Sequence, residues 1–499
     1  MAQLRFSLDA ALGIGAAVVL LSVVAVRVSV RLGLPSLLLY LGIGMLLGES
    51  GLGVRLSNAM LTESLSMAAL VLILAEGGLT TRWADVRPAL GVGISLATAS
   101  VAVSIAVTGA ALHLLLGLGW RTAFLWAAVL SSTDAAAVFS VLRGVRVRRW
   151  LVGALELESG LNDAPVVIAV VLLSSAEPLR WWSPVLVIFE LAVGGAVGAL
   201  LGLGGAWALR RAALPATGLY PLATLSVCVL GYAVGQSLHA SGFLATYVAA
   251  LILGNAALPH RSDVLSFAEG TGWLAQIGLF VLLGLYASPR ALAGALLPAV
   301  AAGSVLLVLA RPLSVVVVAS PFRVPWREQA FLSWAGLRGA VPIVLALIPL
   351  TAQPGNASAR LLVDVVLVLV VLLTLLQGST LPWVARLLAV ARSAEATEIE
   401  VDAAPLDELS ADLLQVRVPL GSKLHNVYLR ELRLPTGATV SLVVRDGVGF
   451  TPGPGTRLRE LDQLLMVATS TSRTVAERRI RAVDRAGRLA RWRGETGQS

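Results

Sequence analysis

Long runs of apolar residues follow one another through most of the chain and are separated by short polar junctions. An α-helix needs about 20 predominantly apolar residues to cross the hydrocarbon core of a bilayer. Thirteen runs reach or approach this length, so the pattern predicts an all-α polytopic membrane domain over residues 1–392. The predicted spans lie at residues 9–30, 33–48, 60–80, 89–118, 121–142, 150–174, 183–209, 218–238, 242–258, 268–287, 291–320, 327–350 and 361–391.

The composition agrees with this pattern. Of the 499 residues, 57% are hydrophobic and only 13% are charged, whereas about a quarter of the residues in a soluble globular chain are charged. These values exclude a soluble enzyme, a disordered chain and a fibrous protein. The net charge of +9 does not indicate a nucleic-acid partner, because the arginines cluster at the ends of apolar runs. The single cysteine, Cys228, excludes a disulfide framework.

The junction arginines predict the orientation of the chain, because cytoplasmic loops carry the excess of positive charge. Alternate junctions carry thirteen and six arginines, and we expect the richer set to be cytoplasmic. With an odd number of spans, the N-terminus then lies outside the cell membrane and the chain after residue 391 lies in the cytoplasm. The richer set is Arg27, Arg31, Arg82, Arg87, Arg143, Arg146, Arg148, Arg149, Arg210, Arg211, Arg261, Arg323 and Arg327.

The character of the chain changes near residue 393. Residues 393–408 are polar and acidic, and we expect them to form a linker. Short β-like runs alternate with turn signals over residues 409–470, which predicts a small α+β cytoplasmic domain. The basic tail, residues 471–499, carries eight arginines in a helical pattern. This pattern indicates a solvated helix, with a membrane-surface helix as the alternative.

Several predicted spans contain ionisable residues, which are costly in a membrane and usually mark a transport pathway. These residues are Asp134 in the fifth span, Glu158 and Asp163 in the sixth, Arg311 in the eleventh and Arg338 in the twelfth. Their concentration predicts an ion pathway through the membrane domain. Glu76 and Glu190 are expected either to line a cytoplasmic funnel or to be solvated at the membrane interface.

Helical spacing in the sixth span surrounds Asp163 with oxygen atoms. Glu158 and Asn162 are four residues apart, and so are Ser159 and Asp163, which places both pairs on adjoining strips of one side of the helix. We therefore expect neutral oxygen ligands from Ser159 and Asn162 to flank the Asp163 carboxylate. Such a group binds either an alkali cation or a proton, which is what exchange transport requires. The alternative is an aspartate satisfied by packing, and the mid-membrane position favours the ion site.

The remaining charges have structural interpretations. Glu158 would repel Asp163, and Arg311 lies alone in an apolar run, so we expect these two residues to form a structural ion pair. The segments around Thr133-Asp134 and Gly336–Pro342 are expected to interrupt helices and expose half-helix ends.

At these breaks, Asp134 would offset a positive helix N-terminus and Arg338 a negative C-terminus. Thr133 could offer its hydroxyl or its carbonyl oxygen to an ion. For Gly336 and Gly339 alone, close helix packing is the alternative.

Motifs for other mechanisms are missing from the sequence. There is no Walker motif for ATP, no potassium-channel filter and no histidine spacing typical of metal ligands. We expect no cofactor, no enzymatic activity and no metal beyond the transported cation. Besides an antiporter, the open alternatives are a ligand-gated cation channel and a membrane sensor that does not transport.

The motifs of the membrane domain resemble those of the NhaP/NHE-type cation/proton antiporters. The resemblance covers residues 9–391 and is carried by Ser132–Ala135, Glu158–Ala164, Ala310-Arg311, Gly336–Val341 and Leu376–Gly378. It implies an inverted-repeat fold with a core and a dimerising scaffold, in which the unwound fifth and twelfth helices cross. It also implies a site region at Thr133, Asp134, Glu158, Ser159, Asn162 and Asp163, with Arg311 as partner of Glu158. The Asn162-Asp163 pair implies electroneutral exchange of one cation for one proton.

Residues 409–469 resemble the C-terminal subdomain of RCK or TrkA-type regulators of potassium transport. The matching positions are Val418-Pro419, Gly421-Ser422, Leu429–Leu432, Pro435, Gly437-Ala438 and Leu461–Val467. This resemblance implies dimerisation, a small regulatory ligand at 409–470, and K⁺ in preference to Na⁺ as the cation. The Rossmann half that often precedes this subdomain is missing, which argues against nicotinamide nucleotide binding.

Overall fold

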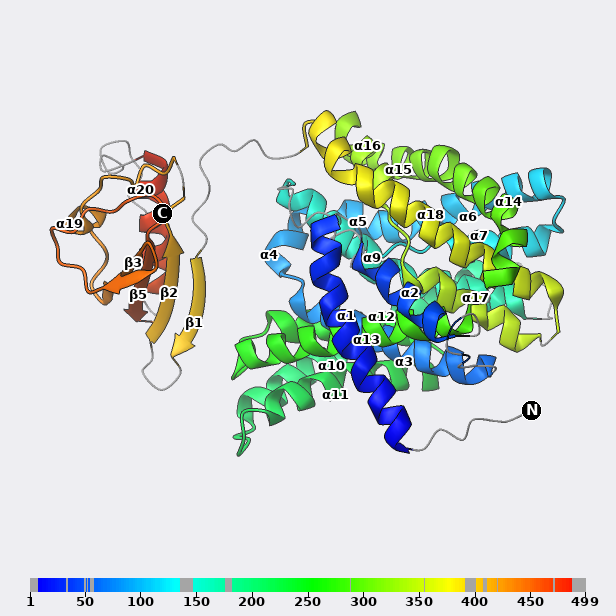
Figure 1. Ribbon diagram of the computed structural model, residues 1–499, viewed down its shortest axis with the longest axis horizontal. Helices are drawn as coiled ribbons and strands as arrows, with labels where there is room; N and C mark the ends of the chain where they lie inside the picture. Colours follow the sequence, from blue (N-terminus) through cyan, green and yellow to red (C-terminus); the bar gives the residue numbers. More distant parts are fainter. Residues whose placement is uncertain are drawn as a thin grey trace. The chain divides into compact units, whose positions relative to one another are not determined.

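The protein is described by a computed structural model, in which the chain forms two compact units, Met1–Ala391 and Arg392–Ser499 (Figure 1). Each unit is described by itself. The structure describes residues 8–32, 35–48, 51, 53, 58–134, 147–175, 182–287, 289–353, 355–390, 401–406, 411–419, 421–469 and 472–486.

The first unit is all-helical over its described residues. Its helices are α1 (Leu8–Leu32), α2 (Ser36–Leu47), α3 (Ala59–Thr80), α4 (Trp83–Val86), η1 (Arg87–Ala89), α5 (Leu90–Ala97), α6 (Ala99–Leu116), α7 (Trp120–Ser131), α9 (Arg149–Ser174), α10 (Ser183–Arg211), α11 (Leu219–Ser237), α12 (Gly242–Asn255), α13 (Arg261–Tyr286), α14 (Pro289–Ser304), η2 (Val305–Ala310), α15 (Arg311–Ala319), η3 (Ser320–Phe322), α16 (Trp326–Ala335), α17 (Ala340–Ala352) and α18 (Ala357–Leu387).

Among the described residues, eight helices are long and apolar enough to cross a membrane, or nine if the bent pair α16 and α17 forms one span. Three shorter apolar helices, Leu12–Arg27, Ser36–Leu47 and Gly242–Asn255, also coincide with predicted spans. The prediction of an all-α polytopic membrane domain is therefore confirmed. The count of thirteen stays a prediction, because the described helices of full spanning length are fewer.

The helices of this unit pack in two groups. In one group α13 packs on α2 and α3, and α12 packs on α3, α10 and α11. In the other, α6 packs on α7, α5 on α9, and α14 and α17 on α18. Figure 1 shows α10, α11 and α13 on one side of the unit and α15, α16 and α18 on the other. Small residues permit close packing in a membrane: a Cβ on Gly44 of α2 would overlap the backbone of α13 at Val281.

Two segments without helix lie beside helices of the second group. Helix α7 ends at Ser131 and the chain continues without helix over residues 132–134. Helices α16 and α17 are separated by residues 336–339 and are bent by 54°. The two interruptions meet, because the Asp134 amide donates a hydrogen bond of 2.9 Å to the Leu337 carbonyl oxygen. The predicted continuation of the fifth span to residue 142 lies outside the described residues.

The second unit is a small α+β domain. Its antiparallel sheet has five strands in the order β1-β2-β5-β3-β4. The elements are β1 (Val401–Leu406), β2 (Ala411–Arg417), α19 (Leu429–Leu432), β3 (Ala438–Arg445), β4 (Val448–Phe450), β5 (Gln463–Thr469) and α20 (Arg473–Ala486). Buried Asp462 accepts two hydrogen bonds of 2.8 Å from Arg445. This bonding raises the pKa of the Arg445 guanidinium above its ordinary value.

Two elements of this unit depart from the sequence-based expectations. Strand β1 lies within residues 393–408, the predicted linker, and pairs along its length with β2. Helix α20 lies within the predicted tail and was expected to be solvated. It instead buries Ala476, Ile480 and Val483 in the core of the unit, because these residues lie four and three positions apart on one helical face. The arginines around them obscured this short apolar stripe. The domain limits themselves stay a prediction.

Candidate ion-binding site

Helix α9 brings four of the predicted site residues into the interior of the membrane unit. Glu158 is 1% exposed, Ser159 6%, Asn162 0% and Asp163 5%. Glu158 and Asn162 are four positions apart, as are Ser159 and Asp163, which keeps the two pairs on neighbouring strips of the helix, as the sequence predicted. Most of this helix is apolar, so its polar side chains must find partners on the helices packed against it.

The partner of Asp163 comes from the break after α7. The Ser132 hydroxyl donates a hydrogen bond of 2.7 Å to the Asp163 carboxylate, and both groups are buried. This geometry differs from the expectation that Ser159 and Asn162 would flank the carboxylate. Neither of these two residues bonds to Asp163, because the unwound segment 132–134 inserts its own hydroxyls beside α9.

Ser159 and Asn162 bind Thr133 instead. The Asn162 side-chain amide donates a hydrogen bond of 2.6 Å to the Thr133 hydroxyl oxygen, and the Ser159 hydroxyl lies 3.3 Å from the same oxygen. The Asn162 side-chain carbonyl oxygen is buried and has no hydrogen-bond partner within the described part of the chain. The three side chains therefore form a neutral network that ties the α7 break to α9.

The charged residues at the breaks lie next to helix ends. Arg338 is buried, and its guanidinium donates to the carbonyl oxygens of Leu130 at 3.0 Å and Gly336 at 2.6 Å, at the C-terminal ends of α7 and α16. The Asp134 carboxylate lies beside Gly339, the residue before α17, since a Cβ on Gly339 would overlap its Oδ2. A cation thus lies at helix C-termini and an anion at a helix N-terminus, where each is favoured by the helix dipole.

Glu158 and Arg311 form a bidentate ion pair in which both side chains are buried. The Arg311 Nη2 atom donates to Glu158 Oε2 at 2.8 Å, and Nη1 donates to Oε1. Nη2 also donates to the Leu332 carbonyl oxygen at 3.1 Å. Arg311 directly follows the π-helical turn η2, a deviation that is frequent at functional sites. The expected contact between the two residues is therefore present.

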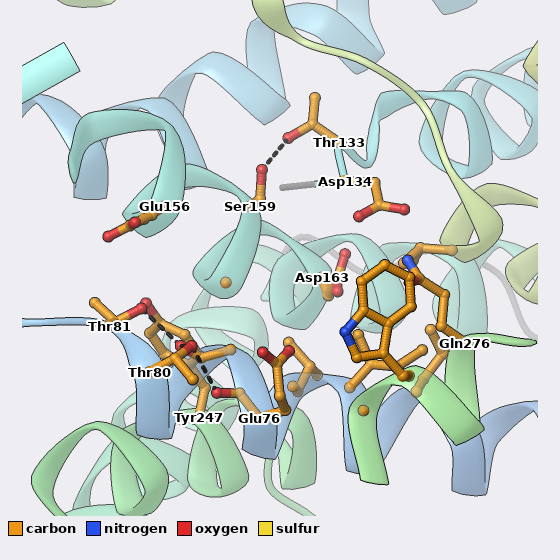
Figure 2. A pocket seen from close by; sticks show the side chains of 18 of the residues that line it. Glu76, Thr80, Thr81, Thr133, Asp134, Glu156, Ser159, Asp163, Tyr247 and Gln276 are labelled. Atoms are coloured by element: carbon orange, nitrogen blue, oxygen red, sulfur yellow. Dashed lines mark hydrogen bonds between the residues drawn. The ribbon is translucent and has the colours of Figure 1, made fainter. Parts of the chain in front are cut away.

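A cavity of about 390 Å³ opens beside this network (Figure 2). Thr133, Asp134, Ser159 and Asp163 are among its lining residues, whereas Asn162 is not. Figure 2 shows Asp134 and Asp163 facing the same space, with Glu76 and Tyr247 across from them and Glu156 to one side. The other lining residues include Thr80, Thr81, Gly160, Glu269 and Gln276.

The structure thus separates residues that the sequence placed together. Asp163, Ser159, Thr133 and Asp134 share one cavity, while Glu158 and Arg311 are not among the residues that line it. Of the two glutamates considered for a funnel, Glu76 lines the cavity and Glu190 does not. Sequence reasoning missed Ser132, although the run of hydroxyl residues before Asp134 could have pointed to it. It also missed Glu156 and Tyr247, whose positions depend on which helices meet.

The membrane unit matches a known protein family. Residues 17–387 match the model of the sodium/hydrogen exchanger family, transmembrane part. The chain belongs to this family. Residues 413–481 match the TrkA-C domain, so both resemblances inferred from the sequence motifs are confirmed. The family consists of transporters and not enzymes, and this member is a multi-pass membrane protein. The orientation of its termini stays a prediction.

The relatives are transporters of known type. The chain is 37% identical over 440 residues to the K(+)/H(+) antiporter NhaP of Alkalimonas amylolytica, an alignment that covers 86% of this chain and 76% of the relative. It is 34% identical over 471 residues to the K(+)/H(+) antiporter NhaP2 of Shewanella baltica, covering 92% of this chain and 81% of the relative.

A solved structure supports the fold. The sodium proton antiporter MjNhaP1 from Methanocaldococcus jannaschii superimposes with a TM-score of 0.67 at 21% sequence identity. The match covers 76% of this chain and 99% of that chain. At this level of identity the likeness concerns the fold alone, and it agrees with the helical membrane unit described above.

Proposed function

We propose that the protein is a secondary antiporter that exchanges a monovalent cation for protons across the cell membrane, with K⁺ preferred and Na⁺ as the alternative. The two relatives with 34–37% identity, both named K(+)/H(+) antiporters, support this reaction. The TrkA-C domain supports K⁺ in particular, because such modules occur in regulators of potassium transport.

The observation that carries the proposal is the environment of Asp163. Glu158 is compensated by Arg311, and Arg338 is compensated by two backbone carbonyl oxygens. Asp163 is buried to the same degree, but its one hydrogen bond among the described residues comes from the neutral Ser132 hydroxyl. A buried carboxylate without a fixed positive partner favours a mobile one. A proton or a monovalent cation from the cavity supplies that charge.

The same reasoning gives the stoichiometry. The Asp163 carboxylate carries one negative charge, so one proton or one monovalent cation neutralises it. If the two compete for this carboxylate, each loaded form of the carrier has the same net charge. Carrying a cation one way and a proton the other way then moves no net charge, which makes the exchange electroneutral. The Asn162-Asp163 pair implied the same result by resemblance.

The helix breaks supply the means for alternating access. In transporters with broken helices, the binding site lies where the half-helices meet, and access alternates as one group of helices moves against the other. Here the two breaks are joined by the bond from Asp134 to Leu337 and to α9 through Thr133. We propose that α7, α9, α16 and α17 move as one body against α3 and α13, which form the opposite wall of the cavity.

The second unit is proposed to regulate the exchanger and to be dispensable for its chemistry. All residues proposed for the ion site precede residue 339, and the unit has a hydrophobic core of its own. We propose that it pairs with its copy in a homodimer or binds a small ligand at residues 409–470. An effector shifts activity only if it binds one transport state better than another.

The test is exchange by the purified protein in proteoliposomes that contain a pH-sensitive dye. K⁺, Na⁺, Rb⁺ and Li⁺ are added in turn to vesicles with an imposed pH gradient, and dye dequenching reports proton movement. We expect the largest response to K⁺ and none in vesicles without protein. Conduction of K⁺ without coupled proton movement would support the channel alternative and contradict the proposal.

A further inference from the structure

The cavity contains polar groups that the proposed exchange at Asp163 does not use. Glu156 lines the cavity together with Thr80, Thr81 and Tyr247 (Figure 2). Glu156 lies three residues before Ser159 and seven before Asp163, so the three residues follow one face of α9. Seven helical residues correspond to about 10 Å along the helix axis. Glu156 is therefore in the same cavity as Asp163, about two helical turns away from it.

Tyr247 presents an unsatisfied hydroxyl at this end of the cavity. Its side chain comes from α12, is 2% exposed and lies against Gly160 of α9, where a Cβ would overlap the tyrosine ring. Its hydroxyl lies next to the Thr81 side chain, but within the described residues it makes no hydrogen bond of normal geometry. Buried polar groups are normally paired, and one left unpaired in a cavity indicates a missing ligand or water. Gly160 thus seats the ring so that its polar end reaches the cavity.

Two threonines add oxygen atoms to the same region. The Thr80 hydroxyl donates its proton to the Glu76 carbonyl oxygen at 2.9 Å, and the Thr81 hydroxyl donates to the Gly77 carbonyl oxygen at 2.7 Å. With their protons directed back to α3, both hydroxyl oxygens keep lone pairs for another partner. Lone pairs of this kind suit a cation and do not suit an anion.

Glu156 supplies the charge. It is half-buried, and it forms no ion pair or hydrogen bond with any described residue. A carboxylate beside neutral hydroxyl oxygens matches a monovalent cation in charge and in ligand type, and Glu76 of α3, which also lines the cavity, adds a second carboxylate to this region.

We propose that Glu156, Tyr247 and Thr81 form an outer station for a monovalent cation, separate from Asp163 and occupied before the cation reaches it. The inference rests on the proposed antiport and adds a binding step to it. If arginine-rich junctions are cytoplasmic, the station lies toward the cytoplasm, because Arg82 follows Thr81 and Arg149 begins α9. The station raises the cation concentration beside Asp163 without taking part in the proton exchange.

Transport kinetics test the role of the station. Replacing Glu156 with Gln keeps the size of the side chain and removes its charge, so we expect the cation KM to rise about fivefold while the maximal rate is retained. Tyr247→Phe removes one oxygen and should raise the KM about two- to threefold. In the double variant the increase in cation KM should be smaller than the product of the two single increases, because both groups bind the same ion.

The matched control is Glu190→Gln. Glu190 lies on membrane helix α10 outside the cavity, so the cation KM of this variant should equal that of the wild type. An unchanged KM in Glu156→Gln would overturn the station. So would a loss of maximal rate at saturating cation, because Glu156 would then belong to the exchange step itself.

Cation binding by a transport-inactive protein separates this inference from the proposed function. Thermal unfolding of purified Asp163→Asn is compared in KCl and in choline chloride, since a ligand that binds the folded state raises the unfolding temperature. We expect K⁺ to stabilise Asp163→Asn, and the added change Glu156→Gln to abolish that stabilisation. No K⁺ effect in Asp163→Asn, or an effect that survives Glu156→Gln, would overturn the station. If Asp163→Asn and its Glu156→Gln derivative respond to K⁺ as expected but the wild-type protein exchanges no cation, the proposed antiport is wrong and the outer station stands.

Discussion

Two carboxylates on the same helix have different surroundings. Glu158 and Asp163 both lie on α9 and both are at least 95% buried. Glu158 faces a full positive charge on Arg311 and receives two hydrogen bonds from it. Asp163 faces the cavity and receives one hydrogen bond from the Ser132 hydroxyl. Burial alone therefore does not distinguish these two carboxylates; the transport role proposed for Asp163 depends on its lack of a fixed countercharge among the described residues.

The largest expected effect is the loss of exchange when the Asp163 carboxylate is removed. Asp163→Asn keeps the volume of the side chain and removes the group that binds a cation or a proton. We expect cation/proton exchange to fall by at least about a hundredfold, a difference of about 2.7 kcal/mol in transition-state free energy, while the protein still folds and inserts. Dye dequenching in proteoliposomes at equal protein amounts measures the loss.

The matched control is Asp364→Asn, which changes an aspartate on α18 outside the cavity and should retain exchange. Normal exchange by Asp163→Asn would show that Asp163 and Glu158 do not differ in the proposed way. Loss of folding in Asp163→Asn, detected by size-exclusion chromatography, would instead make Asp163 a structural residue like Glu158.

The next largest effect is a loss of stability when the ion pair of Glu158 and Arg311 is broken. Removal of one partner from a buried ion pair typically costs about 3–5 kcal/mol, because the other charge is left unpaired. We expect Glu158→Ala and Arg311→Ala each to lower the free energy of unfolding by about this amount. The double variant should lose less than the sum of the two. Thermal unfolding in detergent measures all three, and additive losses would argue against a stabilising contact.

A smaller effect concerns the neutral network between the two carboxylates. Thr133→Val removes the hydroxyl that accepts the Asn162 amide and leaves that buried donor unpaired, at a cost of about 1–3 kcal/mol. We expect lower thermal stability and a higher cation KM. The control is Thr271→Val on α13, whose hydroxyl donates to the carbonyl oxygen of Phe267 within its own helix and to no other described residue. Equal effects of the two substitutions would mean that the network adds nothing specific to the site.

The smallest expected effect concerns the second unit. Truncation near residue 393 leaves Glu158, Asp163 and their partners in place, so exchange should survive. A tenfold change in rate or in effector response corresponds to about 1.4 kcal/mol, which lies in the usual range of allosteric coupling. Transport by truncated and full-length protein is compared across a pH series. If the truncated protein is folded and inserted but inactive, the second unit belongs to the transport machinery. If the pH–activity curves of the truncated and full-length proteins superimpose, the second unit does not regulate exchange.

The sequence was most informative where local spacing determines structure. The apolar runs predicted the helices of the membrane unit, because hydrophobic length is a property of each segment alone. The unpaired charges of Glu158 and Arg311 predicted their contact, since each needed a partner in an apolar environment. The breaks at Asp134 and Arg338 were expected from residues that suit exposed helix ends, and the structure has unwound segments at both positions.

The sequence was least informative where distant segments meet. Ser159 and Asn162 are neighbours of Asp163 on α9, but whether they bind it depends on the segment that inserts beside them. That segment brings Thr133 to both residues and Ser132 to Asp163. The cavity wall formed by Glu156 and Tyr247 likewise depends on the contact of α9 with α12. In the second unit, the charged residues of α20 masked a short apolar stripe that includes Ala476, Ile480 and Val483.

The most direct test of the account is the balance point of exchange measured at different membrane potentials. Proteoliposomes are prepared with a tenfold K⁺ gradient and an opposing series of pH gradients, and the potential is set independently with a second permeant ion and its ionophore. If one K⁺ exchanges for one proton at Asp163, net proton movement should stop at a proton gradient equal to the K⁺ gradient, whatever the potential. A balance point that shifts with the potential would mean that net charge crosses the membrane, and would contradict exchange through a single carboxylate.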